Sequence, residues 1–192
     1  MSGQDELTLD PATTALIVVD VQNFTMGHTT FPHSAQQILE RNVTLAERCR
    51  ARGVTVILVR IIGDPARRLA TVTDAPFASF SFPDDWREFP PVLGPMEGDV
   101  VVVKHNWGSF YGTDLDLILR RKGIRTVLIT GIATNFGVES TARQAHEAAY
   151  AVINIEDAMG DYSPEDHRFA IERIFPRLGR VRTTAQVLSA LG

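Results

Sequence analysis

The chain alternates short runs of apolar residues with segments of helical periodicity, and this alternation constrains the fold more than any other feature. Residues 14–21 (TALIVVDV) form the first run, and such continuous apolarity is typical of a central parallel strand covered on both faces. Further strands are predicted at residues 54–62, 100–104, 126–131, 151–155 and 180–182. Repeated strand–helix units predict a three-layer α/β fold around a doubly wound, mainly parallel sheet.

Capping residues set the expected helix boundaries. Ser34 offers an N-cap for a helix that runs to Arg52, and Gly53 is expected to end it. Further helices are predicted at residues 114–122 after Thr113, 138–149, 164–175 after Ser163, and 184–191.

Length and composition indicate a single domain over residues 1–192. The net charge of −4 and the lack of a basic patch argue against a nucleic-acid partner. No apolar run is long enough to span a membrane. Cys49, the single cysteine, is expected to be a small buried residue of a helix, and a chain without disulfides fits the cytoplasm.

Residues 63–98 interrupt the strand–helix rhythm. This stretch contains six of the ten prolines and five large aromatic residues, namely Phe77, Phe80, Phe82, Trp86 and Phe89. A loop of this length is usually functional or covered by a partner. Two interpretations stay open: a lid or pocket wall, and an oligomer contact.

Three features are expected at the carboxyl edge of the sheet, where ligands bind in such folds. Asp20 and Lys104 each end an apolar strand, and residues 132–137 form a turn that opens a helix. A buried aspartate needs a cation and a buried lysine needs an anion, so we expect the two side chains to pair. The turn directs backbone N–H groups and the positive end of a helix dipole toward one point, which suits an anion or oxyanion.

Three ordered motifs resemble the isochorismatase-like hydrolase family over residues 13–191. They are residues 17–23 (IVVDVQN), 104–115 (KHNWGSFYGTDL) and 131–143 (GIATNFGVESTAR). The resemblance implies a six-stranded sheet of order 3-2-1-4-5-6 and a homo-oligomer, either a dimer or a tetramer. It also implies a cis peptide between Ile132 and Ala133.

Most members of this family use an Asp–Lys–Cys triad in which the thiolate attacks an amide or a related carbonyl. Asp20 and Lys104 match the first two members, but Gly137 occupies the nucleophile position. Glycine has no side chain to acylate. The chain therefore resembles a subgroup with glycine in place of the nucleophilic cysteine.

Two branches of the family remain in competition. True isochorismatases also lack the cysteine and hydrolyse a vinyl ether with an aspartate and water, and residues 157–167 (DAMGDYSPEDH) resemble them. Residues 135–143, apart from Gly137, resemble the amidase branch. The leading hypothesis is a hydrolase of a small carboxylated or cyclic substrate. Asp20 is its general acid/base and Lys104 the partner of Asp20, water attacks, and the N–H groups of Ala133 and Gly137 bind negative charge. The alternative is an inactive, Cys-less relative of the amidases that serves as a binding or scaffold protein.

Several nearby residues are candidates for substrate binding. Phe24, Trp107 and Phe136 flank the motifs and are expected to form an aromatic wall, whereas Phe110 is assigned to the core. Asn135 either binds substrate or caps the turn.

Other charged residues point less clearly to function. Arg67 and Arg68 are either carboxylate ligands or solvated, and Glu139 and Arg143 are expected to pair along a helix. The five histidines lack metal-ligand spacing, so neither a metal nor a cofactor is predicted.

Overall fold

The computed structural model describes residues 7–62, 72, 74 and 84–192. Its six strands form one sheet of order β3-β2-β1-β4-β5-β6, and every neighbouring pair is parallel. The strands are β1 (Thr14–Val19), β2 (Thr55–Ile61), β3 (Val100–Lys104), β4 (Thr126–Ile132), β5 (Ala151–Gly160) and β6 (Arg180–Arg182). The predicted fold class and strand order are confirmed.

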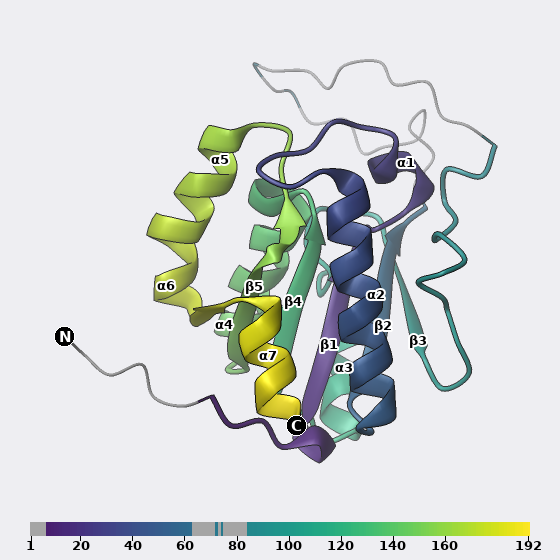
Figure 1. Ribbon diagram of the computed structural model, residues 1–192, viewed down its shortest axis with the longest axis vertical. Coiled ribbons are helices and arrows are strands. Elements are labelled where there is room, and N and C mark those ends of the chain that lie inside the picture. The colour runs from purple at the N-terminus through teal and green to yellow at the C-terminus, as the bar shows by residue number, and fades with distance from the viewer. Residues whose placement is uncertain (1–6, 63–71, 73, 75–83) are drawn as a thin grey trace.

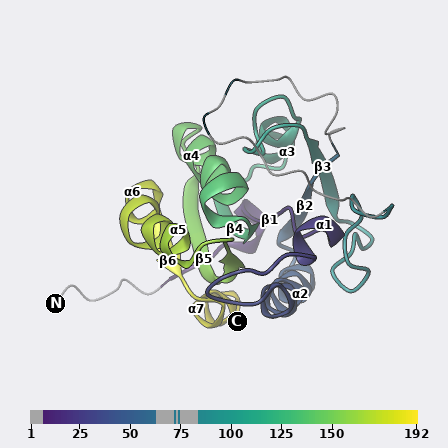
Figure 2. The same ribbon diagram turned by 90° about the horizontal axis from the view of Figure 1, so that it is seen from above.

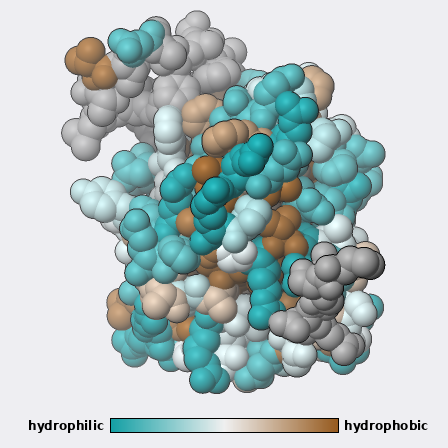
Figure 3. Space-filling model, turned by 90° about the vertical axis from the view of Figure 1, so that its left-hand side faces the viewer, coloured by the Kyte–Doolittle hydropathy of each residue, from teal (hydrophilic) through white to brown (hydrophobic). Residues whose placement is uncertain are grey.

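Helices cover both faces of the sheet (Figures 1 and 2). They are α1 (Asn23–Met26), α2 (Ala35–Ala51), α3 (Leu115–Arg121), α4 (Glu139–Glu147), α5 (Pro164–Phe169), α6 (Phe175–Leu178) and α7 (Thr184–Leu191), with a 3₁₀ turn η1 (Pro11–Thr13) and π-helical turns η3 (Thr134–Val138) and η4 (Ala170–Ile174). One core layer packs α2 and α7 on the sheet, and the other packs α3, α4 and α6 on the opposite face. The side of the molecule that carries α5 and α6 presents mainly hydrophilic residues (Figure 3). Among the described residues, no helix combines the length and apolarity that a membrane crossing requires.

Hydrogen bonds confirm the predicted N-caps Ser34 and Ser163. Ser34 and Gln37 form a reciprocal capping box at the start of α2, and Gly53 follows that helix with φ of +75°. Ser163 accepts a hydrogen bond from the Asp166 N–H at the start of α5. Cys49 is fully buried in α2, as expected, and its burial raises the pKa of the thiol to about 12.

Strand β5 is longer than predicted because its second half leaves the regular ladder. Ile129 pairs with Asn154, but Gly131 pairs with Met159, so two residue steps along β4 correspond to five along β5. Polar residues interrupt the apolar run in this irregular stretch, so the sequence pattern did not predict that the strand continues.

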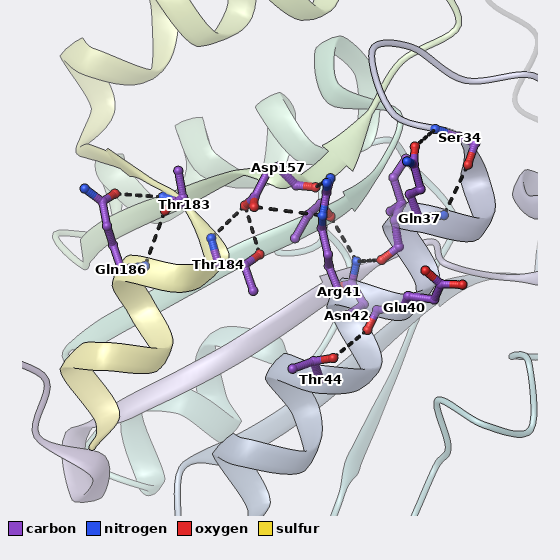
Figure 4. A network of polar contacts seen from close by, with 12 residues as sticks. Ser34, Gln37, Glu40, Arg41, Asn42, Thr44, Asp157, Thr183, Thr184 and Gln186 are labelled. Atoms are coloured by element: carbon purple, nitrogen blue, oxygen red, sulfur yellow. Dashed lines mark hydrogen bonds and ion pairs between the residues drawn. The ribbon is translucent and has the colours of Figure 1, made fainter.

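The irregular part of β5 ties three elements together (Figure 4). Asp157 Oδ1 accepts hydrogen bonds from the N–H and the hydroxyl of Thr184, at 2.7 and 2.8 Å, at the start of α7. Arg41 of α2 donates to the Asp157 carbonyl oxygen, and Asn42 donates to the Ala158 carbonyl oxygen. The bonds from Arg41 and Asn42 give these two carbonyl oxygens the partners that a regular ladder would otherwise provide.

Two predicted helices differ from the structure at their ends. The helix expected over residues 138–149 is preceded by η3, in which the Val138 N–H donates to the Ala133 carbonyl oxygen, five residues back. The helix expected to end near Phe175 is interrupted by η4. Helix α1 has only four residues, too few for a periodic signal.

Candidate functional site at the carboxyl edge of the sheet

Asp20 and Lys104 form a buried ion pair at the carboxyl edge. Lys104 Nζ lies 2.7 Å from Asp20 Oδ2 and also donates a hydrogen bond to the Trp107 carbonyl oxygen. Lys104 is fully buried, whereas Asp20 keeps 8% of its surface exposed. Asp20 is therefore the more exposed member of a pair in which both residues are buried.

The environment of Asp20 raises the pKa of its carboxyl above the ordinary value. Burial raises the pKa of the Asp20 carboxyl, and the adjacent Lys104 ammonium opposes this rise. A carboxyl that holds its proton more tightly than an exposed one is suited to general acid chemistry near neutral pH.

Gly137 lies directly against this ion pair. A Cβ built on Gly137 falls 3.0 Å from Asp20 Oδ2 and 3.1 Å from Lys104 Nζ. Contacts this short require the neighbouring atoms to move. The structure thus brings Asp20, Lys104 and Gly137 together. Both charged groups contact the point at which a side chain at position 137 would begin.

The turn that contains Gly137 has the local geometry that the resemblance implied. The peptide bond between Ile132 and Ala133 is cis. The N–H groups of Phe136 and Val138 both donate to the Ala133 carbonyl oxygen at 3.2 Å. The two donors predicted for an oxyanion, Ala133 and Gly137, belong to this turn.

Asp161, which the sequence did not identify as a site residue, holds the start of the turn. Its Oδ2 accepts a hydrogen bond of 2.6 Å from the Asn135 N–H, and its Oδ1 accepts one of 2.7 Å from the Tyr162 N–H. Burial raises the pKa of the Asp161 carboxyl, and these two N–H groups oppose the rise. No local pattern reveals this role, because the irregularity of β5 is what carries Asp161 to the turn.

The backbone and the side chain of Asn135 have different environments. Its backbone N–H is the donor to Asp161. Its side-chain Oδ1 is buried and has no hydrogen-bond partner among the described residues. The backbone therefore belongs to the turn, and the side chain stays a candidate for substrate contact.

A second side chain, His167 of α5, contacts the same turn. Its Nδ1 lies 2.9 Å from the hydroxyl of Thr134, and both residues are buried. Burial and, to a lesser extent, the charge of His33 lower the pKa of His167 to about 4. His167 is therefore neutral at physiological pH.

Thr141 fixes Gly137 to the loop that follows Lys104. The Thr141 hydroxyl donates to the Gly137 carbonyl oxygen at 2.6 Å. Since this bond uses its single proton, the hydroxyl accepts from Ser109, whose N–H lies at 3.2 Å and whose Oγ lies at 2.8 Å. Two of the three sequence motifs are joined through this hydroxyl.

Gln22, of the first motif, connects β2 to the segment near Arg87. Its side-chain amide accepts from the Ile61 N–H and donates to the carbonyl oxygens of Ile61 and Arg87. Backbone bonds from Asn23 to Glu88 extend the same contact. The last part of the long loop is therefore anchored beside Asp20.

Aromatic residues on the segments that carry the site motifs pack in two groups. Trp107 and Phe136 pack edge to face with ring centroids 4.9 Å apart. Phe24 packs against His28 at 4.9 Å, and His28 packs against Tyr162 at 5.7 Å. The assignment of Phe24, Trp107 and Phe136 to substrate binding stays a prediction. Tertiary packing adds His28 and Tyr162, which the sequence did not indicate, to the group of Phe24.

Two further expectations about side chains hold. Phe110 packs against the core and lies 5.9 Å from the ring of Tyr150. Glu139 and Arg143 form an ion pair of 2.9 Å along α4.

Part of the long loop lies outside the described residues. This part includes Arg67, Arg68, Phe77, Phe80 and Phe82. The two described aromatic residues of the loop, Trp86 and Phe89, are buried.

Comparison with known proteins assigns the chain to a family. Residues 14–186 match the model of the isochorismatase family, described as the isochorismatase domain. The chain belongs to the isochorismatase family. It is a hydrolase by family, as the three motifs predicted.

Relatives within the isochorismatase family cover nearly the whole chain. The chain is 42% identical over 187 residues to the uncharacterized isochorismatase family protein YecD of Escherichia coli O157:H7, which covers 96% of this chain and 100% of YecD. It is 34% identical over 214 residues to the ureidoacrylate amidohydrolase RutB of Methylobacterium radiotolerans. That alignment covers 98% of this chain and 83% of RutB.

A solved structure extends the likeness to the fold. An isochorismatase family protein from Burkholderia thailandensis superposes with a TM-score of 0.89 at 44% identity, covering 96% of this chain and 97% of that chain.

Two other features lie apart from the ion pair of this isochorismatase-family chain. The described residues form a surface hollow lined by Glu165, Asp166, Arg168, Phe169, Glu172 and Arg173, and none of these belongs to the predicted site. Within the described ranges, no three His, Cys, Asp or Glu side chains are grouped to hold a metal ion.

Proposed function

We propose that the chain is a single-domain hydrolase in which Asp20 is the general acid/base, Lys104 its charged partner and water the attacking group. The substrate is a small carboxylated or cyclic molecule. The observation that carries the proposal is the position of Gly137, whose hypothetical Cβ falls 3.0 Å from Asp20 Oδ2. The ion pair therefore lies directly beside the position that a nucleophilic side chain at residue 137 would occupy.

Vinyl ether hydrolysis fits this arrangement because it needs no covalent acyl intermediate. Protonation of the terminal alkene carbon by Asp20 forms a C–H bond, breaks the π bond and leaves an oxocarbenium ion. Water adds to the cationic carbon and returns one proton to Asp20. The resulting hemiketal then loses the alcohol, breaks the C–O bond and leaves a ketone. Vinyl ether and water thus become ketone and alcohol, with no change in oxidation state.

The roles of the remaining residues follow from their places around Asp20. The buried ammonium of Lys104 holds the carboxylate by an ion pair of 2.7 Å. Because the vinyl ether scheme develops positive charge at the reacting carbon, the N–H groups of Ala133 and Gly137 are assigned to negative charge that the substrate already carries, such as a carboxylate. Phe24, Trp107 and Phe136 are assigned to the apolar part of the substrate, and the side chain of Asn135 to a polar group of it.

A second candidate function is amide chemistry or its remnant, which the similarity to a relative named ureidoacrylate amidohydrolase favours. In that case the chain is a Cys-less relative of amidases that binds a ligand without turning it over. Both candidates assume a cytoplasmic homo-oligomer, either a dimer or a tetramer, with a small molecule as ligand.

Turnover of isochorismate, measured beside a panel of small esters, amides and vinyl ethers, tests the proposal. We expect hydrolysis of a vinyl ether by the unmodified protein and its loss in Asp20→Asn. Amide hydrolysis that arises only in Gly137→Cys favours the amidase origin. No turnover of isochorismate or any other vinyl ether would remove the proposed chemistry.

A further inference from the structure

Asp20 has a backbone conformation that few residues other than glycine adopt. Its φ is +54°, in the left-handed region, at the point where β1 ends. The conformation turns the chain sharply away from the strand, and the direction of the Asp20 side chain depends on it. A contact that holds this turn therefore also holds the carboxylate.

The Thr25 hydroxyl makes that contact. Thr25 Oγ1 donates to the Asp20 carbonyl oxygen at 2.5 Å and accepts from the Gln22 N–H at 3.1 Å. The Gln22 carbonyl oxygen lies farther away, at 3.0 Å, so the bond to Asp20 is the main use of the hydroxyl proton. Thr25 is only 5% exposed, so water is a poor substitute for the hydroxyl.

We propose that Thr25 is a positioning residue that holds the Asp20 carboxylate against Lys104 and Gly137. The hydroxyl closes the turn between residues 20 and 22 through one atom. Among the described residues its hydrogen bonds go to Asp20 and Gln22, so its effect on Lys104 and Gly137 passes through the backbone of Asp20. Its catalytic consequence rests on the proposed function, but its effect on Asp20 does not.

The hydroxyl can be removed without removing the surrounding framework. Helix α1 keeps the bond of 2.9 Å from the Met26 N–H to the Gln22 carbonyl oxygen. Asp20 keeps the bond of 2.9 Å from its own N–H to the Val59 carbonyl oxygen. Valine preserves the shape of threonine and lacks the hydroxyl, whereas serine preserves the hydroxyl. Thr25→Val and Thr25→Ser therefore form a matched pair.

The experiment measures the titration of Asp20 by ¹³C NMR of protein labelled at aspartate side chains. Asp20→Asn assigns the resonance. We expect Thr25→Ser to titrate like the unmodified protein and Thr25→Val to titrate at higher pH, because a displaced carboxylate loses contact with the lysine that stabilises its charge. Coincident titration curves for Thr25→Val and the unmodified protein would overturn the proposal.

Two further measurements complete the test. In the unmodified protein, the buried hydroxyl proton of Thr25 is expected to exchange slowly enough for its NMR resonance to be seen. Absence of that resonance would also overturn the proposal, even if Thr25→Val does not fold. With a substrate in hand, Thr25→Val is expected to lower kcat about tenfold to a hundredfold at little change in KM, and Thr25→Ser to restore it. Failure of every substrate would remove the proposed function and leave the NMR result to decide the role of Thr25.

Discussion

Gly137 and Asp20 are so close that a single carbon atom added at Gly137 would crowd the Asp20 carboxylate. The hypothetical Cβ of Gly137 meets Asp20 Oδ2 at 3.0 Å, while Lys104 Nζ lies 3.1 Å from the same point. The ion pair and a side chain at position 137 therefore compete for space. This competition gives the first prediction.

Gly137→Ala is expected to displace the ion pair by a few tenths of an ångström and to lower stability by about 1–3 kcal/mol, as overpacking usually does. Turnover of any substrate found for the unmodified protein should fall as well. Urea unfolding measures the stability. Gly27→Ala is the matched control, because its added Cβ meets only ordinary contacts at 3.4 and 3.7 Å. Equal stability of the Gly137→Ala variant and the unmodified protein would show that the ion pair accommodates the added methyl group without steric conflict.

Lys104→Met is expected to destabilise the fold by about 3–5 kcal/mol, because it leaves Asp20 buried without a cation. Asp20→Asn combined with Lys104→Met should recover part of this loss, since no uncompensated charge remains. A double-mutant cycle in urea gives the coupling energy. Additive losses would indicate that the two groups do not interact.

The pH dependence of Lys104→Met has a definite sign. The pKa of the Asp20 carboxyl is already raised by burial, and loss of Lys104 removes the opposing effect. The folded state then keeps a proton at pH values where the unfolded state has lost it. The free energy of unfolding of the variant should therefore fall as the pH rises above about 4, the ordinary range of an aspartate. A flat profile would contradict the assignment.

Acid should weaken the fold through His167. Its pKa falls from 6.5 to about 4 on folding, so the unfolded state binds a proton that the folded state excludes between these values. The free energy of unfolding should fall as the pH drops from 6.5 toward 4, by on the order of 3 kcal/mol at most. His167→Gln keeps a polar partner for Thr134 and should flatten that part of the profile. An unchanged slope in His167→Gln would assign the effect to other groups.

Gly108→Ala should disturb the loop after Lys104. Its Cβ would lie 2.1 Å from Gln144 Oε1, which accepts the Phe110 N–H at 3.1 Å. We expect a loss of about 1–3 kcal/mol. In a Gln144→Ala background the same substitution should cost much less, because the obstructing amide is gone. Thermal unfolding of the four proteins measures the difference, and equal costs in both backgrounds would refute the clash.

The sequence predicted the sheet because its central strands are rich in apolar residues. The strands at residues 14–19 and 126–132 could be predicted as buried from their composition alone, without information on tertiary contacts. The same property exposed Asp20 and Lys104, since a charge that ends an apolar strand is conspicuous. Parallel strands then place such ends at one edge of the sheet.

Other parts of the site were hidden because they depend on contacts between distant segments. Asp161 reaches Asn135 only through the irregular second half of β5. Tyr162 and His28 meet each other across 134 positions of sequence with no shared pattern. Thr25 lies in a four-residue helix, and its importance rests on the unusual backbone of Asp20.

The additional residues of β5 make this strand sensitive to changes in length, although it contains neither member of the ion pair. Two steps along β4 are matched by five along β5, and Asp161 follows once Met159 and Gly160 have resumed the pairing. Removal of one residue from positions 155–158 would pull the Asp161 carboxylate back from the Asn135 N–H without altering a single member of the ion pair. Insertions and deletions in this stretch are thus expected to be tolerated poorly, although no proposed catalytic residue lies there.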